Sequence, residues 1–267
     1  MQRAHERGMS LIGLLVVFVC IVILGVISLT ALNKSITGEG SAQENTVRSV
    51  QDKMNLYAIH QALVANAIDN DGRFLTPSVL AGSNDRSLDT TANLFSAMVM
   101  HYGVRPEMLI SGNEYNGYVV QDMDYDHRAY DPRAGVYWDP SFEADLERGS
   151  NVSFAHVPLF GERFEKNWQT AMSSSFPILG NRGPKDGIPD PTSWTYGRNG
   201  TWGGHIVFGD GHIEFTNSFT PGSVFFESGG QRFADNIFAV EDGMDGADAI
   251  LSFTKEMTRE GPVLQFD

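Results

Sequence analysis

Two histidines and two carboxylates lie close together in the stretch Arg198 to Phe215, and their side chains are of the kinds that bind metals or transfer protons. His205, Asp210 and His212 could bind zinc or iron, and His212 with Glu214 could act as an acid–base pair. Asp210-Gly211 lies between two apolar runs, which is a strong signal for a β-hairpin turn. His205 then lies near the open end of the hairpin, roughly 17 Å along the strand from the turn. We therefore interpret this stretch as a hairpin and not as a metal site.

The hairpin interpretation also predicts a register. With Asp210 and Gly211 alone at the tip, Phe208 lies opposite Ile213 and Ile206 opposite Phe215. These four side chains would share one apolar, buried face, and Val207 and Glu214 would occupy the other.

A second group of carboxylates, Asp242, Asp245 and Asp248, lies between glycines near the C-terminal end of the sequence. Oxygen ligands in a flexible loop suit calcium, so a calcium site is one interpretation. A solvated acidic turn is the other, and it is the more common use of such loops. We expect no cofactor, with calcium as the alternative.

Other catalytic signatures are absent from the sequence. It has no G-x-S-x-G, H-E-x-x-H or phosphate-binding loop, and no Ser, His and Asp in a recognisable triad spacing. We therefore expect that the protein is not an enzyme. The net charge of -14 would repel a phosphate backbone, so we also expect no nucleic acid partner.

The elements that position these residues begin with an apolar segment. Ser10 to Leu32 contains no charged residue, and Met9 to Leu32 as a helix would reach roughly 36 Å, enough to cross a hydrocarbon core of about 30 Å. Arg3 and Arg7 precede the span and should stay in the cytoplasm. We predict a cytoplasmic leader at 1–8, a single transmembrane helix at 9–33 and export of everything that follows.

The start of this segment, Gly8, Met9, Ser10, Leu11 and Ile12, resembles the class III leader of type IV pilins and type II secretion pseudopilins. The resemblance implies that prepilin peptidase cuts between Gly8 and Met9, that the new N-terminus is methylated, and that residues 10–13 take part in assembly. Pilin-like proteins usually carry Glu at the fifth mature position, where this chain has Gly13. That carboxylate is thought to pair with a neighbouring subunit's N-terminal ammonium, which Gly13 cannot do.

A hinge and an amphipathic helix are predicted over residues 34–68. Apolar or long side chains recur at spacings of three and four, which predicts one stripe that packs on the core, widened by Leu56, Ile59 and Leu63. Asp52 is expected to face water. The helix should end near Asp69, at the turn Asp69 to Gly72. The stripe comprises Val47, Val50, Met54, Tyr57, Gln61, Val64 and Ile68.

The remaining residues, 69–267, are predicted to form a β-rich exported globular domain. Its hairpin region resembles a bacterial pseudopilin-like group that carries an H-X9-DG motif. Asp210 and Gly211 match the DG half, but the motif histidine would fall at Gly200. Further matches are Gly203, Gly204, Ile206, Val207, Phe208, His212, Ile213, Phe215 and the segment 235–238.

Together these features predict an α+β, pilin-like fold. A long N-terminal transmembrane and amphipathic helix would pack on a mainly antiparallel sheet with an enlarged C-terminal region. The expected function is that of a pseudopilin-like structural subunit of a type II secretion or type IV pilus-like assembly. Its partners would be prepilin peptidase, other pseudopilin subunits and the bacterial cytoplasmic membrane. The alternative is a membrane-tethered, exported binding or hydrolase domain that does not polymerise.

Overall fold

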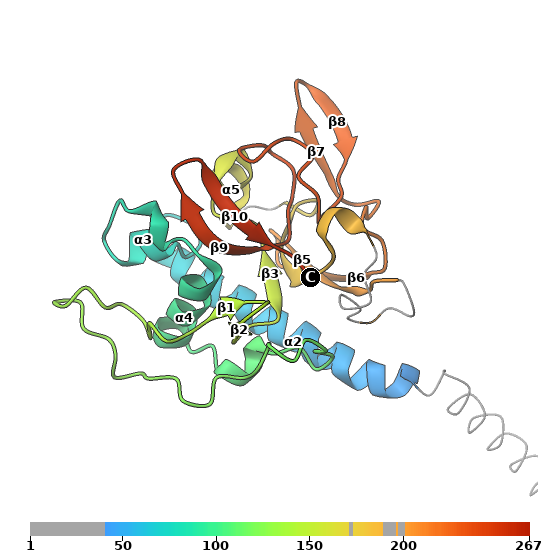
Figure 1. The fold of residues 1–267 in the computed structure, drawn as a ribbon. Helices are drawn as coiled ribbons and strands as arrows, with labels where there is room; N and C mark the ends of the chain where they lie inside the picture. Colours follow the sequence, from blue (N-terminus) through green and yellow to red (C-terminus); the bar gives the residue numbers. More distant parts are fainter. Residues whose placement is uncertain (1–40, 171–172, 189–195, 197–200) are drawn as a thin grey trace, which may run out of the picture. The chain divides into compact units, whose positions relative to one another are not determined.

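A computed structural model describes residues 41–170, 173–188, 196 and 201–267 of the chain (Figure 1). Residues 48–267 form one compact unit. A long helix packs against antiparallel sheets, so the predicted α+β class is confirmed.

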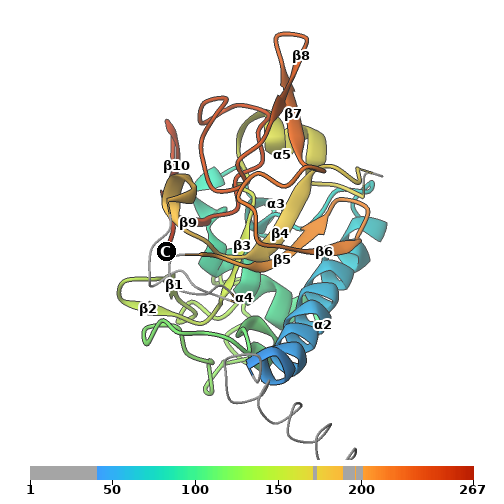
Figure 2. The same cartoon turned by 90° about the vertical axis from the view of Figure 1, so that its right-hand side faces the viewer.

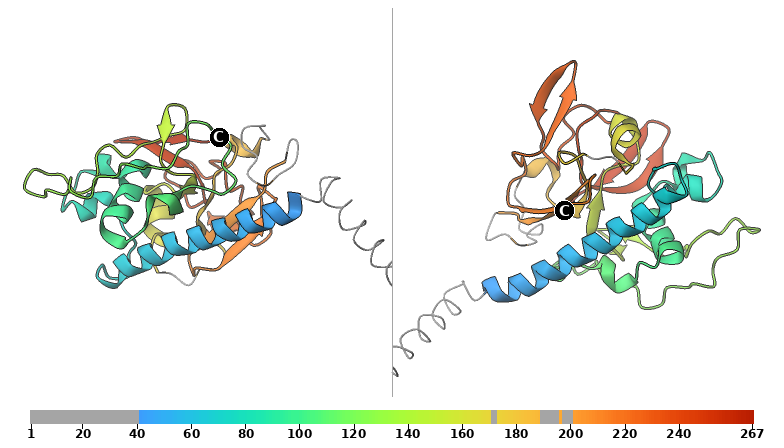
Figure 3. Two further views of the ribbon diagram at one scale, coloured as in Figure 1. Left: turned by 90° about the horizontal axis from the view of Figure 1, so that it is seen from below. Right: turned by 180° about the vertical axis from the view of Figure 1, so that it is seen from behind.

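Helix α2 spans Ser41–Ile68 and runs along one side of a four-stranded sheet (Figures 2 and 3). It ends where the sequence predicts, because the Asp69 to Gly72 turn leaves the helical path. Asp71 and Gly72 adopt left-handed φ values of 49° and 79°. The Gly72 amide then donates to the Ala67 carbonyl at 2.9 Å, which satisfies one of the carbonyls that a helix end leaves free.

The other helices are short and lie on the same body. Helix α4 is the longest of them, and it is capped by the Thr90 hydroxyl at its start and by Gly103, with φ 70°, at its end. Their bounds are α3 Pro77–Leu80, η2 Arg86–Leu88, α4 Thr91–Tyr102, η3 Pro106–Leu109, α5 Gly161–Asn167 and η4 Lys185–Gly187.

The central sheet has the strand order β3-β4-β5-β6, and all of its pairs are antiparallel. Its strands are β3 Phe154–His156, β4 Pro177–Asn181, β5 Gly204–Phe208 and β6 Ile213–Thr216. The described residues also form three two-stranded ribbons, and the one formed by β7 and β8 projects from the body (Figures 1 and 2). Their strands are β1 Ala144–Asp145, β2 Gly149–Ser150, β7 Phe225–Ser228, β8 Gln231–Ala234, β9 Phe253–Thr258 and β10 Gly261–Gln265.

The predicted β5–β6 hairpin exists, but its predicted register is wrong by one residue. Ile206 pairs with Glu214 and Val207 with Ile213. The tip contains Gly209 as well as Asp210 and Gly211, because the Gly211 amide donates to the Phe208 carbonyl at 2.8 Å. A three-residue loop of this kind needs a left-handed residue only at its end, and Gly211 supplies it with φ 87°.

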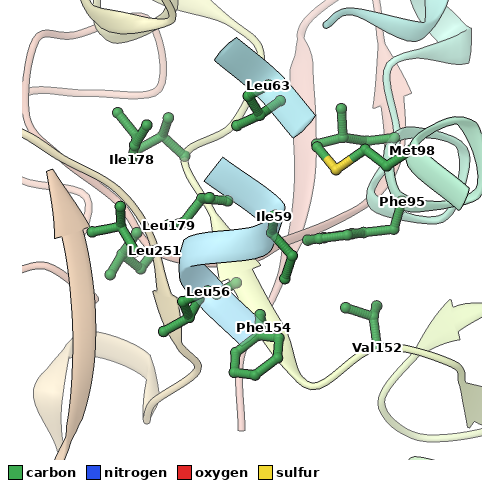
Figure 4. Packing of buried hydrophobic residues seen from close by; sticks show 14 of the residues in the cluster. Leu56, Ile59, Leu63, Phe95, Met98, Val152, Phe154, Ile178, Leu179 and Leu251 are labelled. Atoms are coloured by element: carbon green, nitrogen blue, oxygen red, sulfur yellow. The ribbon is translucent and has the colours of Figure 1, made fainter. Parts of the chain in front are cut away.

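Strand β5 is also buried on both faces, contrary to the prediction of one buried face. All five of its residues are buried. Helix α2 covers one face, where Ser49 contacts His205, and the segment that contains Leu251 covers the face of Ile206. The core forms where α2, α4 and the sheet meet (Figure 4). Residues drawn there include Leu56, Ile59, Leu63, Phe95, Met98, Phe154, Ile178, Leu179 and Leu251.

Candidate functional site

Helix α2 carries two apolar faces, and only one of them packs on the domain. Leu56, Ile59 and Leu63 are fully buried in the core. Val50, Met54 and Tyr57 expose 55%, 63% and 49% of their surface. With about 100° between successive residues, these two sets lie on opposite sides of the helix.

The prediction of a core-facing stripe is therefore wrong for most of its members. Val47, Val50, Met54, Tyr57 and Ile68 are exposed, and only Val64 is packed against the core cluster. The residues expected merely to widen the stripe are the ones that hold the helix on the sheet. We call Val50, Met54, Tyr57 and Ile68 the outer stripe of α2.

The buried side of α2 also contains a carboxylate that the sequence placed in water. Asp52 is 0% exposed. Its Oδ1 accepts from the Gly112 amide at 2.8 Å, and its Oδ2 accepts from three side chains. These are the Ser111 hydroxyl at 2.6 Å, the Tyr196 hydroxyl at 2.8 Å and Asn181 Nδ2 at 3.0 Å.

The donors to Asp52 come from parts of the chain that are far apart in sequence. Ser111 and Gly112 follow η3, Asn181 ends β4, and Tyr196 belongs to the segment before β5. Burial and the neighbouring Asp52 carboxylate raise the pKa of Tyr196, so its hydroxyl stays protonated and donates. Asp52 thus fixes the angle and register at which α2 lies on the sheet, and with them the direction of the outer stripe.

Of the candidate metal residues of the hairpin, His205 lies at the open end, apart from Asp210 and His212, which are in contact at the turn. His205 is buried near the open end, where its Nε2 lies 3.2 Å from the Ser49 hydroxyl. Burial lowers the pKa of His205. At the turn, His212 Nδ1 lies 2.5 Å from Asp210 Oδ1, while Glu214 accepts from the Ser223 hydroxyl at 3.2 Å.

The turn of this hairpin contacts α2 through His60. A Cβ on Gly211 would lie 2.7 Å from His60 Cε1, so the turn and the ring are in close contact. Both ring nitrogens of His60 are buried without a hydrogen bond. Burial lowers the pKa of His60, with Asp210 opposing the change, which keeps the ring neutral against Phe74 and the turn.

The acidic loop near the C-terminal end is organised around an arginine. Asp248 is fully buried and forms an ion pair with Arg163, whose guanidinium also donates to the carbonyls of Gly243 and Met244. Asp242 Oδ2 accepts from the Ala247 amide at 3.0 Å, and the Asp245 carbonyl accepts from the Glu162 amide at 2.8 Å. The Arg163 guanidinium therefore supplies the positive charge in this loop. Across the described part of the chain, no three His, Cys, Asp or Glu side chains form a group that could hold a metal ion.

Gly8, Met9, Ser10, Leu11, Ile12 and Gly13, proposed for processing and assembly, lie outside the described residues, as does the predicted span at 9–33. Among the helices of the described ranges, none is both long and apolar enough to cross a membrane. Comparisons with protein-family models, curated proteins and solved structures gave no match.

Sequence reasoning missed the polar groups that hold the site together. Asp52 was expected to face water and Arg163 was not singled out, because their partners are contributed by distant segments. A weak signal existed for Asp52, since it lies one helical turn before Leu56 and two before Ile59, on the side that is buried.

Proposed function

We propose that this chain is a pseudopilin-like structural subunit of a type II secretion or type IV pilus-like assembly. Prepilin peptidase would process it after Gly8, and it would act from the bacterial cytoplasmic membrane. The outer stripe of α2 carries the proposal. A helix that is already anchored on its own sheet, yet still shows a row of apolar side chains outward, is suited to pack against other subunits.

The free energy that burial of the outer stripe would contribute is consistent with assembly. Burial of a fully exposed Val, Leu or Met side chain contributes about 1.5–3 kcal/mol. The outer-stripe residues expose about half or more of their surface, so covering each would contribute roughly 1 kcal/mol. Several such contacts per subunit, added to the apolar N-terminal segment that precedes α2 in sequence, would favour a packed helical bundle.

Two features of the sequence support the same role. The leader up to Met9 resembles that of type IV pilins and pseudopilins, and the hairpin region resembles the H-X9-DG group without its histidine. An antiparallel sheet that supports one long helix is compatible with both. Gly13 lacks the carboxylate used by most subunits, which favours a minor subunit at the tip, where no further subunit is added above it.

Cysteine cross-linking on the outer stripe tests this proposal. In a Cys20→Ser background, which removes the single native cysteine, cysteines replace Met54 or Tyr57 in cells that express the whole secretion or pilus system. Oxidation should give disulfide-linked adducts with a second copy or, when matching cysteines are placed in the other subunits, with those. A cysteine at exposed Glu256 on β9 is the matched control. If the Met54 and Tyr57 cysteine variants form no more disulfide-linked adduct than the Glu256 control, the result would favour the tethered, non-polymerising domain.

A further inference from the structure

A pocket of about 690 Å³ opens between the loop 115–118, the β1–β2 turn and the chain after β10. The residues that line it include Tyr115, Tyr118, Glu147 and Phe266. Tyr115 and Tyr118 expose 64% and 57% of their surface, so their rings are available to a ligand. This pocket is separate from the outer stripe of α2 and from the hairpin described above.

The walls of the pocket are held in place by hydrogen bonds. Asn116 Nδ2 donates to the Leu146 carbonyl at 2.9 Å, and Asn116 Oδ1 accepts from the Tyr118 amide at 2.9 Å. The Tyr118 carbonyl accepts from the Ser150 amide at 2.9 Å. The Tyr115 hydroxyl donates to Asn113 Oδ1 at 2.8 Å. A ligand would therefore meet a pre-formed surface and would lose little free energy in ordering it.

The charge around the pocket is negative. Asp267, which lines the pocket, pairs with the buried guanidinium of Arg182, and Arg182 also pairs with Glu114, so these three groups sum to one negative charge. The paired Arg182 lowers the pKa of Glu114 against the opposing effect of burial, so this carboxyl stays ionised. Glu147 adds another negative charge at the rim. The nearby cation Arg148 lines a different pocket together with Glu143 and Asp145.

We propose that this pocket binds the ammonium or guanidinium group of a lysine or arginine side chain on a partner polypeptide. Aromatic ring faces attract organic cations, and a negative surrounding strengthens that attraction. A bare metal ion would instead need several carboxylates in one group, which the described residues do not provide. The proposal does not depend on processing or assembly of the chain, and the partner it names is a basic polypeptide.

Ligand-observed saturation-transfer NMR on the full chain tests the proposal. The protein is kept in a non-ionic polyoxyethylene detergent, because sugar or choline head groups could compete for the pocket. The probes are N-acetyl-arginine amide, N-acetyl-lysine amide and the neutral N-acetyl-citrulline amide, which has nearly the shape of the arginine probe. The two cationic probes should bind about three- to fivefold more tightly than the neutral one, the factor expected for a cation on exposed aromatic rings.

Variants locate the binding. Tyr118→Leu should weaken the arginine probe about threefold, whereas Tyr118→Phe should leave it unchanged, because the ring face is retained. Glu147→Gln should weaken it about twofold, and Glu256→Gln on β9 should have no effect. Equal binding of arginine and citrulline probes, no binding of either, or no response to Tyr118→Leu and Glu147→Gln would overturn the proposal. Tighter binding of maltotriose than of the arginine probe would also overturn it and would mark a sugar site.

Discussion

Replacement of Asp52 by Asn should destabilise the protein strongly, although the side chain keeps its size. Both carboxylate oxygens of Asp52 accept hydrogen bonds, and the Gly112 amide alone approaches Oδ1. An Asn side chain must place its NH₂ group either against that amide or against the three donors around Oδ2. At least one buried donor then loses its acceptor and faces another donor. A hydrogen bond to a charged group contributes about 1.5–3 kcal/mol, so we expect a loss of about 2–4 kcal/mol.

Urea unfolding followed by tryptophan fluorescence measures this loss. For a slope of about 1–3 kcal/mol per molar urea, the midpoint of Asp52→Asn should fall by roughly 0.7–4 M. Asp69→Asn is the matched control, because Asp69 is exposed just after the same helix; its change should stay within about 0.5 kcal/mol. A midpoint for Asp52→Asn equal to that of the control would refute the idea that this carboxylate anchors α2.

Three further predictions concern other buried groups. Arg163→Met should cost about 3–5 kcal/mol in urea unfolding, because it leaves the Asp248 carboxylate buried and unpaired. Gly211→Ala should cost about 1–3 kcal/mol in the same assay, because the new methyl group would press on His60 at a φ of 87°. Burial raises the pKa of Asp235 to about 7 from its ordinary 3.8. The protonated carboxyl group contributes its full stabilisation of the folded state below about pH 4, and this contribution is lost as the pH rises through 7. Asp235→Asn cannot ionise, so its stability relative to wild type should increase by up to about 1.4 kcal/mol per pH unit across that window, as measured by urea unfolding at pH 5 and pH 7.5.

Matched variants separate these effects from general loss of structure. Lys166→Met removes an exposed cation from the same helix as Arg163 and should change stability little. Gly222→Ala places a methyl group in open space at an ordinary φ and should be near neutral. An Arg163→Met or Gly211→Ala variant as stable as its control, or an Asp235→Asn difference that does not change with pH, would contradict the corresponding argument.

Local chemistry made some features predictable from the sequence. The Asp69 to Gly72 turn ends α2 because left-handed residues cannot continue a helix, and Asp210-Gly211 marks a hairpin for a related reason. The register was not predictable to one residue. Whether Gly209 joins the loop depends on the hydrogen bond that its amide donates to the carbonyl of Phe176, a residue that directly precedes β4 and is distant in sequence.

The orientation of α2 was mispredicted because the helix is apolar on both sides. Periodicity identifies an apolar stripe, but it cannot say which of two stripes faces the core. The contacts that decide the orientation are long-range. Asp52 accepts hydrogen bonds from Asn181, at the end of β4, and from Ser111, after η3, and both donors are distant from α2 in sequence. Because the prediction from sequence placed the wrong side of α2 on the core, Asp52 was expected to be exposed and the outer stripe to be buried, and the structure shows the reverse.

The most direct test of the proposed role is intact and N-terminal peptide mass spectrometry on protein purified from its native membrane. A structural subunit of a pilus-like machine should be recovered as a chain that starts at methylated Met9, because prepilin peptidase removes residues 1–8. A chain that still starts at Met1 would contradict the pseudopilin-like function and would leave a simple tethered domain.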